Sequence, residues 1–248
     1  MTTKAVLKHA RSLHQKKFRE LSGGFLVQGE RSVRELLGSG WPVQAVFATE
    51  AMARVLGLND ADILPTHEMD RIGTLESGND VVAVVRKPHH PEMSGLEPGE
   101  LVIALDGIAD PGNMGTVLRM ADWFGVRRVL CGPDCVEEFN PKCVQASMGG
   151  FLRVEVHRHE LVPKLQELRS GGATIYLASM EGASVFETAL RAPAVLVMGS
   201  EAHGVSEGIR ALQSELISVP RLGGAESLNV AMAASALCME FTRQRLAR

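Results

Sequence analysis

Three segments rich in glycine and small polar residues hold the side chains best suited to chemistry; they are 106–119, 195–206 and 217–229. In the first, glycines and Pro111 predict a turn, Asn113 can cap the following helix, and Arg119 lies within two turns of that cap. A guanidinium near a helix N-terminus is poorly placed for the helix dipole, so Arg119 favours an anionic partner such as a phosphate. The simpler interpretation is a capped helix with an incidental surface arginine.

The second and third segments are loops that a ligand can approach closely. In the second, an apolar strand runs into a glycine-rich loop, where Glu201 can orient a cation. His203 in that loop is either a general base or simply an exposed histidine. In the third, Ser227 and Asn229 precede an apolar helix and are either ordinary N-caps or part of a loop that offers free N–H groups to a ligand. Ligand sites gather at strand ends in open α/β sheets, so we expect the segments to share one site.

Several common nucleotide, nucleophile and metal signatures are absent from the sequence. There is no G-x-G-x-x-G motif, no G-x4-G-K-[ST] motif and no G-x-S-x-G elbow. The four cysteines lack the C-x2-C spacing of structural zinc sites, so we expect reduced thiols and no metal. They are Cys131, Cys135, Cys143 and Cys238.

The elements that must position these segments alternate between strand and helix along the chain, which predicts an α/β fold class. Prolines collect in 86–99, where their fixed φ and missing N–H break regular structure. We therefore predict domains at 1–88 and 100–248 with a linker at 89–99. Continuous apolar runs in the second domain favour a parallel sheet covered on both faces. Its last helix is apolar on nearly every side and must be buried, in part by a second subunit.

The expected elements have the following limits. The strands are 24–29, 43–47, 62–64, 81–85, 101–105, 128–131, 174–178 and 194–198. The helices are a basic one within 1–19, followed by 30–37, 50–56, 116–124, 141–148, 161–169 and 229–246.

The charge of the chain is unevenly distributed. The 248 residues are 45% hydrophobic and 22% charged, with a formal net charge of −3, which is typical of a globular protein. Residues 1–19 nevertheless contain six basic side chains and no acidic one: Lys4, Lys8, Arg11, Lys16, Lys17 and Arg19. This basic segment is either a solvated helix face or an arm that contacts nucleic-acid phosphates. No long apolar run or leader pattern appears, so we expect a cytoplasmic protein without a membrane span.

Taken in order, the three segments resemble the motifs of the SpoU, or TrmH-like, family of RNA ribose 2′-O-methyltransferases in the SPOUT superfamily. The residues that match N-x-G-x3-R are Asn113, Gly115 and Arg119, and those that match G-x-E-x2-G are Gly199, Glu201 and Gly204. The third motif is matched by Ile217, Val219, Pro220, Glu226, Ser227, Leu228, Asn229 and Val230, and an intermediate stretch by Asn140, Pro141, Lys142, Ala146, Ser147 and Gly149. Residues 13–19 and 25–31 resemble the small RNA-binding domain, similar to a ribosomal protein, that many members carry; Gln28 departs from the acid usual there.

The resemblance implies an enzyme that methylates RNA from S-adenosylmethionine, and a homodimer with a deep trefoil knot in its C-terminal domain. The implied residues of the reacting centre are Asn113, Arg119, Glu201, Ser227 and Asn229. Those implied to hold the cofactor are Met198, Gly199, Gly204, Ile217, Val219, Pro220, Ser227 and Leu228. The implied RNA contacts are Lys8, Arg11, Lys16, Lys17, Arg19 and Arg31. Arg119 has been proposed as the base in this family, but a guanidinium with a pKa above about 12 is a better stabiliser of an alkoxide, with Glu201 orienting it.

Three alternatives stay open from the sequence. The substrate is ribosomal RNA if the first domain acts like its ribosomal-protein relatives, and transfer RNA otherwise. A second alternative is a protein that has kept the fold and binds RNA without catalysis. A third is a methyltransferase that acts on a base nitrogen. The match at Asn113, Arg119 and Asn229 favours transfer to a ribose oxygen.

Overall fold

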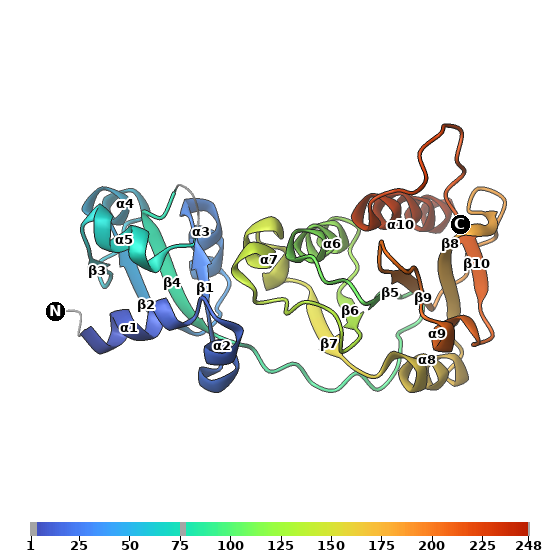
Figure 1. Ribbon diagram of the computed structural model, residues 1–248, viewed down its shortest axis with the longest axis horizontal. Helices are drawn as coiled ribbons and strands as arrows, with labels where there is room; N and C mark the ends of the chain where they lie inside the picture. The colour runs from blue at the N-terminus through green and yellow to red at the C-terminus, as the bar shows by residue number, and fades with distance from the viewer. Residues whose placement is uncertain (1–3, 75–77, 248) are drawn as a thin grey trace.

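The computed structural model describes residues 4–74 and 78–247 and contains two α/β units, joined by a strand-free connection (Figure 1). The first three residues of the predicted basic segment lie outside the described part. The first unit has the helices α1 (Lys4–Ser12), α2 (Lys16–Ser22), α3 (Glu30–Gly38), α4 (Glu50–Leu56) and α5 (Thr66–Ile72). Its strands are β1 (Gly24–Gln28), β2 (Val43–Ala48), β3 (Asp62–Ile63) and β4 (Val81–Arg86).

The four strands of the first unit form a mixed sheet in the order β1-β4-β2-β3. The central strand β4 runs antiparallel to both β1 and β2, and β2 pairs with β3 in parallel. Strand β1 is buried on both faces because its side chains alternate between two cores. Phe25 and Val27 pack toward the second unit, whereas Leu26 packs with the residues beneath α1 and α5.

The second unit follows the connection and is larger. Its strands are β5 (Leu101–Asp106), β6 (Arg128–Cys131), β7 (Glu155–Arg158), β8 (Thr174–Ser184), β9 (Ala194–Gly199) and β10 (Glu215–Ser218). Its helices are α6 (Pro111–Trp123), α7 (Pro141–Ala146), η1 (Gly150–Leu152), α8 (Leu161–Ser170), α9 (Glu207–Arg210) and α10 (Val230–Leu246). The six strands pair only in parallel, in the order β10-β8-β9-β5-β6-β7, which confirms the predicted parallel sheet.

Helices cover both faces of this sheet, as Figure 1 shows, with α6, α7 and α10 on one face and α8 and α9 on the other. The burial of β5 follows from this arrangement. Ile103 and Leu105 pack into the core under α6 and α10, while Val102 and Ala104 pack against α8. A strand covered on both faces needs apolar residues at every position, which is why its sequence shows no polar alternation.

The structure corrects several expected elements. The basic segment forms two helices, α1 and α2, rather than one, and α6 begins at Pro111 rather than at 116. The sequence prediction missed α5, β7, α9 and β10, which are short. Strands β7 and β10 are the two edges of their sheet, so they need little apolar sequence to pair on one side only. All four cysteines are buried free thiols, as expected.

The two units meet across a shared apolar junction. Phe25 of β1 lies 4.5 Å from Phe139 and 5.9 Å from Phe151 between ring centroids, and Trp41 lies 5.8 Å from Phe151. The stretch 87–100 between them contains no helix or strand. Within the described residues, no helix has the length and apolarity to cross a bilayer. The domain limits stay a prediction.

Candidate active site

The three polar segments converge where neighbouring parallel strands end. Strands β8, β9 and β5 are adjacent, so the loop after β9 and the turn from β5 into α6 lie side by side. Asp106 at the end of β5 is the register partner of Gly199 at the end of β9. The Asp106 carboxylate also accepts a hydrogen bond of 2.7 Å from the Ser206 N–H, which ties the β9 loop to the β5 turn.

A small amide–carboxylate cluster joins all three segments. The Glu201 Oε1 accepts hydrogen bonds from the Asn113 Nδ2 at 3.0 Å and from the Asn229 Nδ2 at 2.9 Å. The Asn229 Nδ2 also lies 2.8 Å from the Asn113 Oδ1. Bonds to a charged acceptor are stronger than neutral ones, so Glu201 holds α6 and the start of α10 at fixed positions.

Both helices that enter this cluster are capped by side chains. The Asn229 Oδ1 accepts from the N–H groups of Ala231 and Met232, so this residue caps α10 and joins the cluster at once. For α6 the expected cap is wrong. The Asp110 carboxylate caps that helix by accepting from the Asn113 N–H at 2.7 Å, because Pro111 occupies the first helical position and places Asn113 inside the first turn. The Asn113 side chain is thereby left to reach Glu201.

Arg119 lies two turns into α6 with its side chain exposed. Among the described residues it has no hydrogen bond or ion pair, and Glu201 is engaged with the two asparagines. The expected pairing in which Glu201 orients Arg119 is therefore wrong for this structure. An exposed guanidinium without a partner in the described part of the chain is available to an anionic ligand.

A cavity of about 480 Å³ opens beside the cluster. Its walls come from the ends of β8, β9 and β10, the loop 219–229 and the first turns of α10. The residues predicted from the sequence to hold the cofactor all lie in its lining: Met198, Gly199, Gly204, Ile217, Val219, Pro220, Ser227 and Leu228. Glu201 lines it too, which places the cavity and the amide cluster in one site.

The sequence reasoning missed part of this lining. Residues 178–181 within β8 and Arg210 of α9 also face the cavity. Nothing in the local sequence pointed to them, because β8 was expected to end at 178, whereas it continues to Ser184 alongside β10. His203 is exposed and does not line the cavity, which favours the simple interpretation of that residue.

Gly199 allows the β9 loop to close tightly at the mouth of the cavity. A Cβ built at this position would lie 2.1 Å from the Gly204 carbonyl carbon, closer than any side chain can approach. Ser200 and Gly204 exchange backbone hydrogen bonds of 2.8 and 3.1 Å across the turn, and Gly204 has a φ of +66°. Glycine at both positions is therefore required by the backbone.

A hydrogen-bonded thiol supports the turn after β5. The Cys135 Sγ lies 3.1 Å from the Leu105 carbonyl oxygen and accepts from the Ile108 N–H at 3.4 Å. A hydrogen bond from Cys131 lowers the pKa of the Cys135 thiol to about 7, although burial opposes the shift. Because Cys135 is buried, we assign it to the support of this turn.

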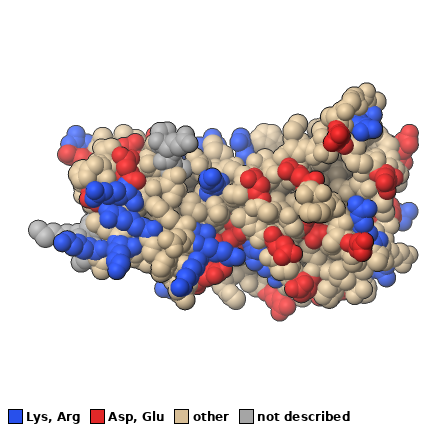
Figure 2. Space-filling model, viewed as in Figure 1, with Lys and Arg blue, Asp and Glu red and all other residues tan. Residues whose placement is uncertain are grey.

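Basic side chains gather on the first unit, which holds α1 and α2, from the outer end of the molecule toward the second unit (Figure 2). Lys8 and Lys17 are exposed, and Lys16 is exposed in a 3.6 Å pair with Glu20. Arg11 is half-buried against Glu68, and Arg31 on α3 lies 3.4 Å from Glu35. The lysines of this surface are thus open to solvent.

Arg19 is the exception and corrects one prediction. Only 2% of its side chain is exposed, so it cannot contact RNA in this structure. Its guanidinium points into the junction between the units and pairs with Glu137. The positive charge that the sequence pattern assigned to a phosphate is neutralised by a carboxylate far along the chain.

Comparisons with known protein families match both units. The model of the SpoU rRNA Methylase family matches residues 100–239, and that of the MRM3-like substrate binding domain matches residues 4–87.

Relatives and solved structures agree with these matches along the whole chain. The chain is 28% identical to the 23S rRNA (guanosine(2553)-2'-O)-methyltransferase RlmP of Bacillus subtilis, over 93% of each chain. Its fold is similar to that of a TrmH-family protein from Porphyromonas gingivalis, with a TM-score of 0.87, 37% identity and coverage of 98% and 99% of the two chains. The SpoU methyltransferase AviRb from Streptomyces viridochromogenes, solved in complex with the cofactor AdoMet, gives a TM-score of 0.87 at 26% identity over 99% of both chains.

Proposed function

The chain belongs to the SpoU rRNA methylase family, and we propose that it transfers a methyl group from S-adenosylmethionine to a ribose 2′-hydroxyl of ribosomal RNA. The observation that carries this proposal is the cluster of Asn113, Glu201 and Asn229, which joins the start of α6, the helix that bears the exposed Arg119, to a cavity lined by glycine loops. The cavity and the arginine offer places for two different substrates. Methyl transfer to an RNA oxygen needs both.

The cavity suits S-adenosylmethionine in size and chemistry. Its volume of about 480 Å³ lies within the range of roughly 300–1,000 Å³ typical of small-molecule sites. Ile217, Val219 and Leu228 offer apolar contact, and the glycine loop at Gly199 leaves backbone groups within reach of a ligand. When bound, S-adenosylmethionine supplies a methyl group on a positively charged sulfur.

Arg119 then acts on the RNA side of the reaction. The ribose oxygen becomes negative as its proton leaves, and a fixed guanidinium stabilises such charge. Arginine keeps its own proton in proteins, so we assign Arg119 to charge stabilisation. The proton of the ribose hydroxyl passes to solvent at this exposed position. Holding the reactants in line can contribute about 7–11 kcal/mol, and the amide cluster fixes the helix that bears Arg119.

The first unit is the proposed RNA-binding part. Its match to a substrate binding domain and the exposed Lys8, Lys16 and Lys17 support contact with phosphates. Ribosomal RNA is favoured because the relative from Bacillus subtilis is named as a 23S rRNA methyltransferase. That relative matches this chain over 93% of each sequence. We place the enzyme in the cytoplasm, where a bacterial ribosome is assembled.

We further propose a homodimer. Met232 and Met239 on α10 are each 62% exposed, and Trp123 on α6, which packs against α10, is 82% exposed. Large apolar side chains gathered on adjoining helices are typical of an interface, and a second copy would bury them beside the cavity. The trefoil knot that the family resemblance implies stays a prediction.

The deciding experiment incubates the protein with S-adenosylmethionine labelled in the methyl group and with separate pools of ribosomal and transfer RNA. Nuclease digestion and mass spectrometry then locate the methyl group. We expect incorporation into ribosomal RNA at a ribose oxygen, and none with Arg119→Ala. Label on a base nitrogen, label in transfer RNA alone, or no label with a folded protein that binds the cofactor would each refute the proposal.

A further inference from the structure

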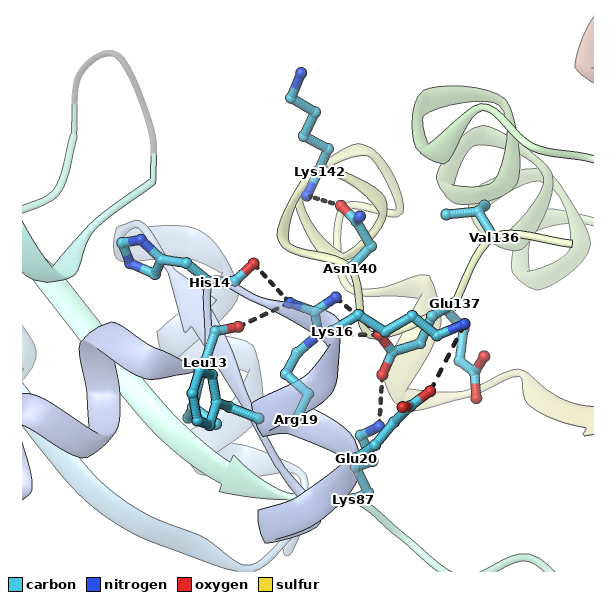
Figure 3. Close-up of polar contacts among 12 residues, drawn as sticks. Leu13, His14, Lys16, Arg19, Glu20, Lys87, Val136, Glu137, Asn140 and Lys142 are labelled. Atoms are coloured by element: carbon cyan, nitrogen blue, oxygen red, sulfur yellow. Dashed lines mark hydrogen bonds and ion pairs between the residues drawn. The ribbon is translucent and has the colours of Figure 1, made fainter.

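One buried carboxylate joins the two units. The Glu137 Oε2 accepts hydrogen bonds from the Arg19 Nε at 3.0 Å and from one terminal nitrogen of the same guanidinium at 2.8 Å (Figure 3). Lys87, the first residue after β4, donates to the other oxygen of Glu137. The side chains of Arg19, Glu137 and Lys87 are only 2%, 8% and 22% exposed. Two cations of the first unit thus converge on one anion of the second.

Such an arrangement is a costly way to gain stability. Burying a charge costs desolvation free energy, and apolar side chains of similar volume often stabilise a protein as well or better. Burial raises the pKa of Glu137, but hydrogen bonds from Lys87 and Arg19 outweigh it and hold the pKa below its usual value. The carboxylate is therefore charged at neutral pH. What it adds over apolar packing is direction, because its partners must lie in one geometry.

Arg19 also holds the basic helices α1 and α2 in place. The same guanidinium donates to the carbonyl oxygens of Leu13 at 2.8 Å and His14 at 2.9 Å, which form the turn between α1 and α2. Figure 3 shows the Arg19 side chain between these carbonyls and Glu137. The exposed lysines of α1 and α2 are consequently fixed relative to the second unit.

Glu137 also connects to the helix that bears Arg119. Its carbonyl oxygen accepts from the Asn140 N–H at 3.0 Å, and the Asn140 side chain caps α7. Helix α7 packs on α6 so closely that a Cβ on Gly115 would lie 2.4 Å from the Cys143 carbonyl oxygen. The path from Glu137 to α6 therefore runs through hydrogen bonds and rigid packing.

A second ion pair ties the units at α6. Arg153 bonds to Asp122 on α6 at 2.9 Å and lies 3.3 Å from Glu35 on α3 of the first unit. The aromatic cluster of Phe25, Phe139 and Phe151 lies in the same junction. The junction thus has apolar and ionic attachments, and of these ion pairs the one at Glu137 is the more buried.

We propose that Glu137 is a positioning residue: it sets the register between the basic helices α1 and α2 and helix α6, so that RNA held by the first presents its ribose at Arg119. The statement that RNA is presented at Arg119 rests on the proposed function. The statement that Glu137 fixes the orientation of the two units does not depend on the proposed function.

The kinetic test compares Glu137→Gln with Glu138→Gln. Glu138 is the matched control, because it lies in the same loop but pairs with Arg158 inside the second unit, at 2.8 Å. For Glu137→Gln we expect turnover at saturating ribosomal RNA to fall by about tenfold or more, since misplacement by about 1 Å can cost a hundredfold. We expect the dissociation constants for RNA and S-adenosylmethionine to stay within about twofold, a split that partial unfolding would not give. Equal turnover in the two variants would overturn the proposal.

The structural test measures the distance between the units by spin labels at Val55→Cys and Gln166→Cys. Both positions are exposed, on α4 and α8, and the four native cysteines are buried. We expect a narrow distance distribution in the parent protein and in Glu137→Asp, and a broad one in Glu137→Gln. If Glu137→Gln does not fold, Lys87→Met removes one cation, leaves the Arg19 pair, and should broaden the distribution less.

The outcomes separate the two proposals. An unchanged narrow distribution in Glu137→Gln, or in Lys87→Met where that variant replaces it, refutes the positioning role. A parent protein that methylates neither RNA pool refutes the proposed function, while the distance measurement still decides whether Glu137 fixes the units.

Discussion

Replacing Gly115 with alanine tests whether the packing of α6 on α7 holds the reacting side chains in place. The added Cβ would lie 2.4 Å from the Cys143 carbonyl oxygen and 2.6 Å from the Ala146 Cβ. A carbon and a carbonyl oxygen need about 3.3 Å, so the helices must separate by about 1 Å. That movement would stretch the bond between Asn113 and Glu201, now 3.0 Å, beyond the usual hydrogen-bond limit of about 3.2 Å.

Two opposing terms set the change in stability. Alanine favours a helix over glycine by about 1 kcal/mol. Overpacking a tight contact costs about 1–3 kcal/mol. The free energy of unfolding of Gly115→Ala should therefore change little or fall by up to about 2 kcal/mol. Turnover should fall further, by about tenfold to a hundredfold, because the helix that bears Arg119 is displaced.

The assay combines urea unfolding, calorimetric binding of S-adenosylmethionine and initial rates of methyl transfer. Cofactor binding should be unchanged, because the cavity lining comes from β8, β9, β10, α9, α10 and their loops. Gly38→Ala at the end of α3 is the control, since its added Cβ meets no described atom within 4 Å. If Gly115→Ala is as stable as this control and turns over normally, the argument from close packing is refuted.

Three further predictions concern single side chains. Arg119→Lys should be inactive from about pH 6 to pH 10, because an ammonium lacks the planar fork of a guanidinium, and initial rates that recover at raised pH would instead favour a titrating base. Asn229→Ser keeps a capping oxygen without adding charge and should unfold in urea like the parent, whereas Asn229→Ala should lose about 1 kcal/mol. Both variants should lose turnover, since neither carries the side-chain amide that donates to Glu201. The pKa of Glu137 is lowered in the folded protein, so its contribution to holding the two units together is complete above the unfolded pKa of about 4.3 and is lost as the pH falls through the folded pKa. The fluorescence of Trp41, which packs on Phe151, should report this acid transition. A Glu137→Gln protein that shows the same transition would contradict the prediction.

The fold class and much of the site could be predicted because their signals are local. Strands β5 and β9 are continuous apolar runs, because a strand that is buried on both faces has apolar residues at successive positions. The loop glycines at 199 and 204 are dictated by a tight turn within six residues of chain. Such features can be read without knowledge of the rest of the molecule.

The errors concern contacts between distant parts of the chain. Arg19 counts as one of six basic residues in the sequence, yet its partner Glu137 is 118 positions away and removes it from the surface. Glu201 was expected to face Arg119 but bonds to two asparagines, because the cap of α6 falls at Asp110 and rotates Asn113 toward it. Long-range pairing decides the first case. The phase of α6, set by its cap at Asp110, decides the second.

The double use of Asn229 limits what evolution or design can place at that position. Its oxygen caps α10 while its nitrogen holds the amide cluster, so helix stability and site geometry cannot be adjusted separately. Aspartate and serine supply only the first half of this requirement, and glutamine is too long to fold back on its own helix. A library randomised at codon 229 and selected for methylation should therefore return asparagine alone, and the position would carry no usable diversity for engineering a new specificity.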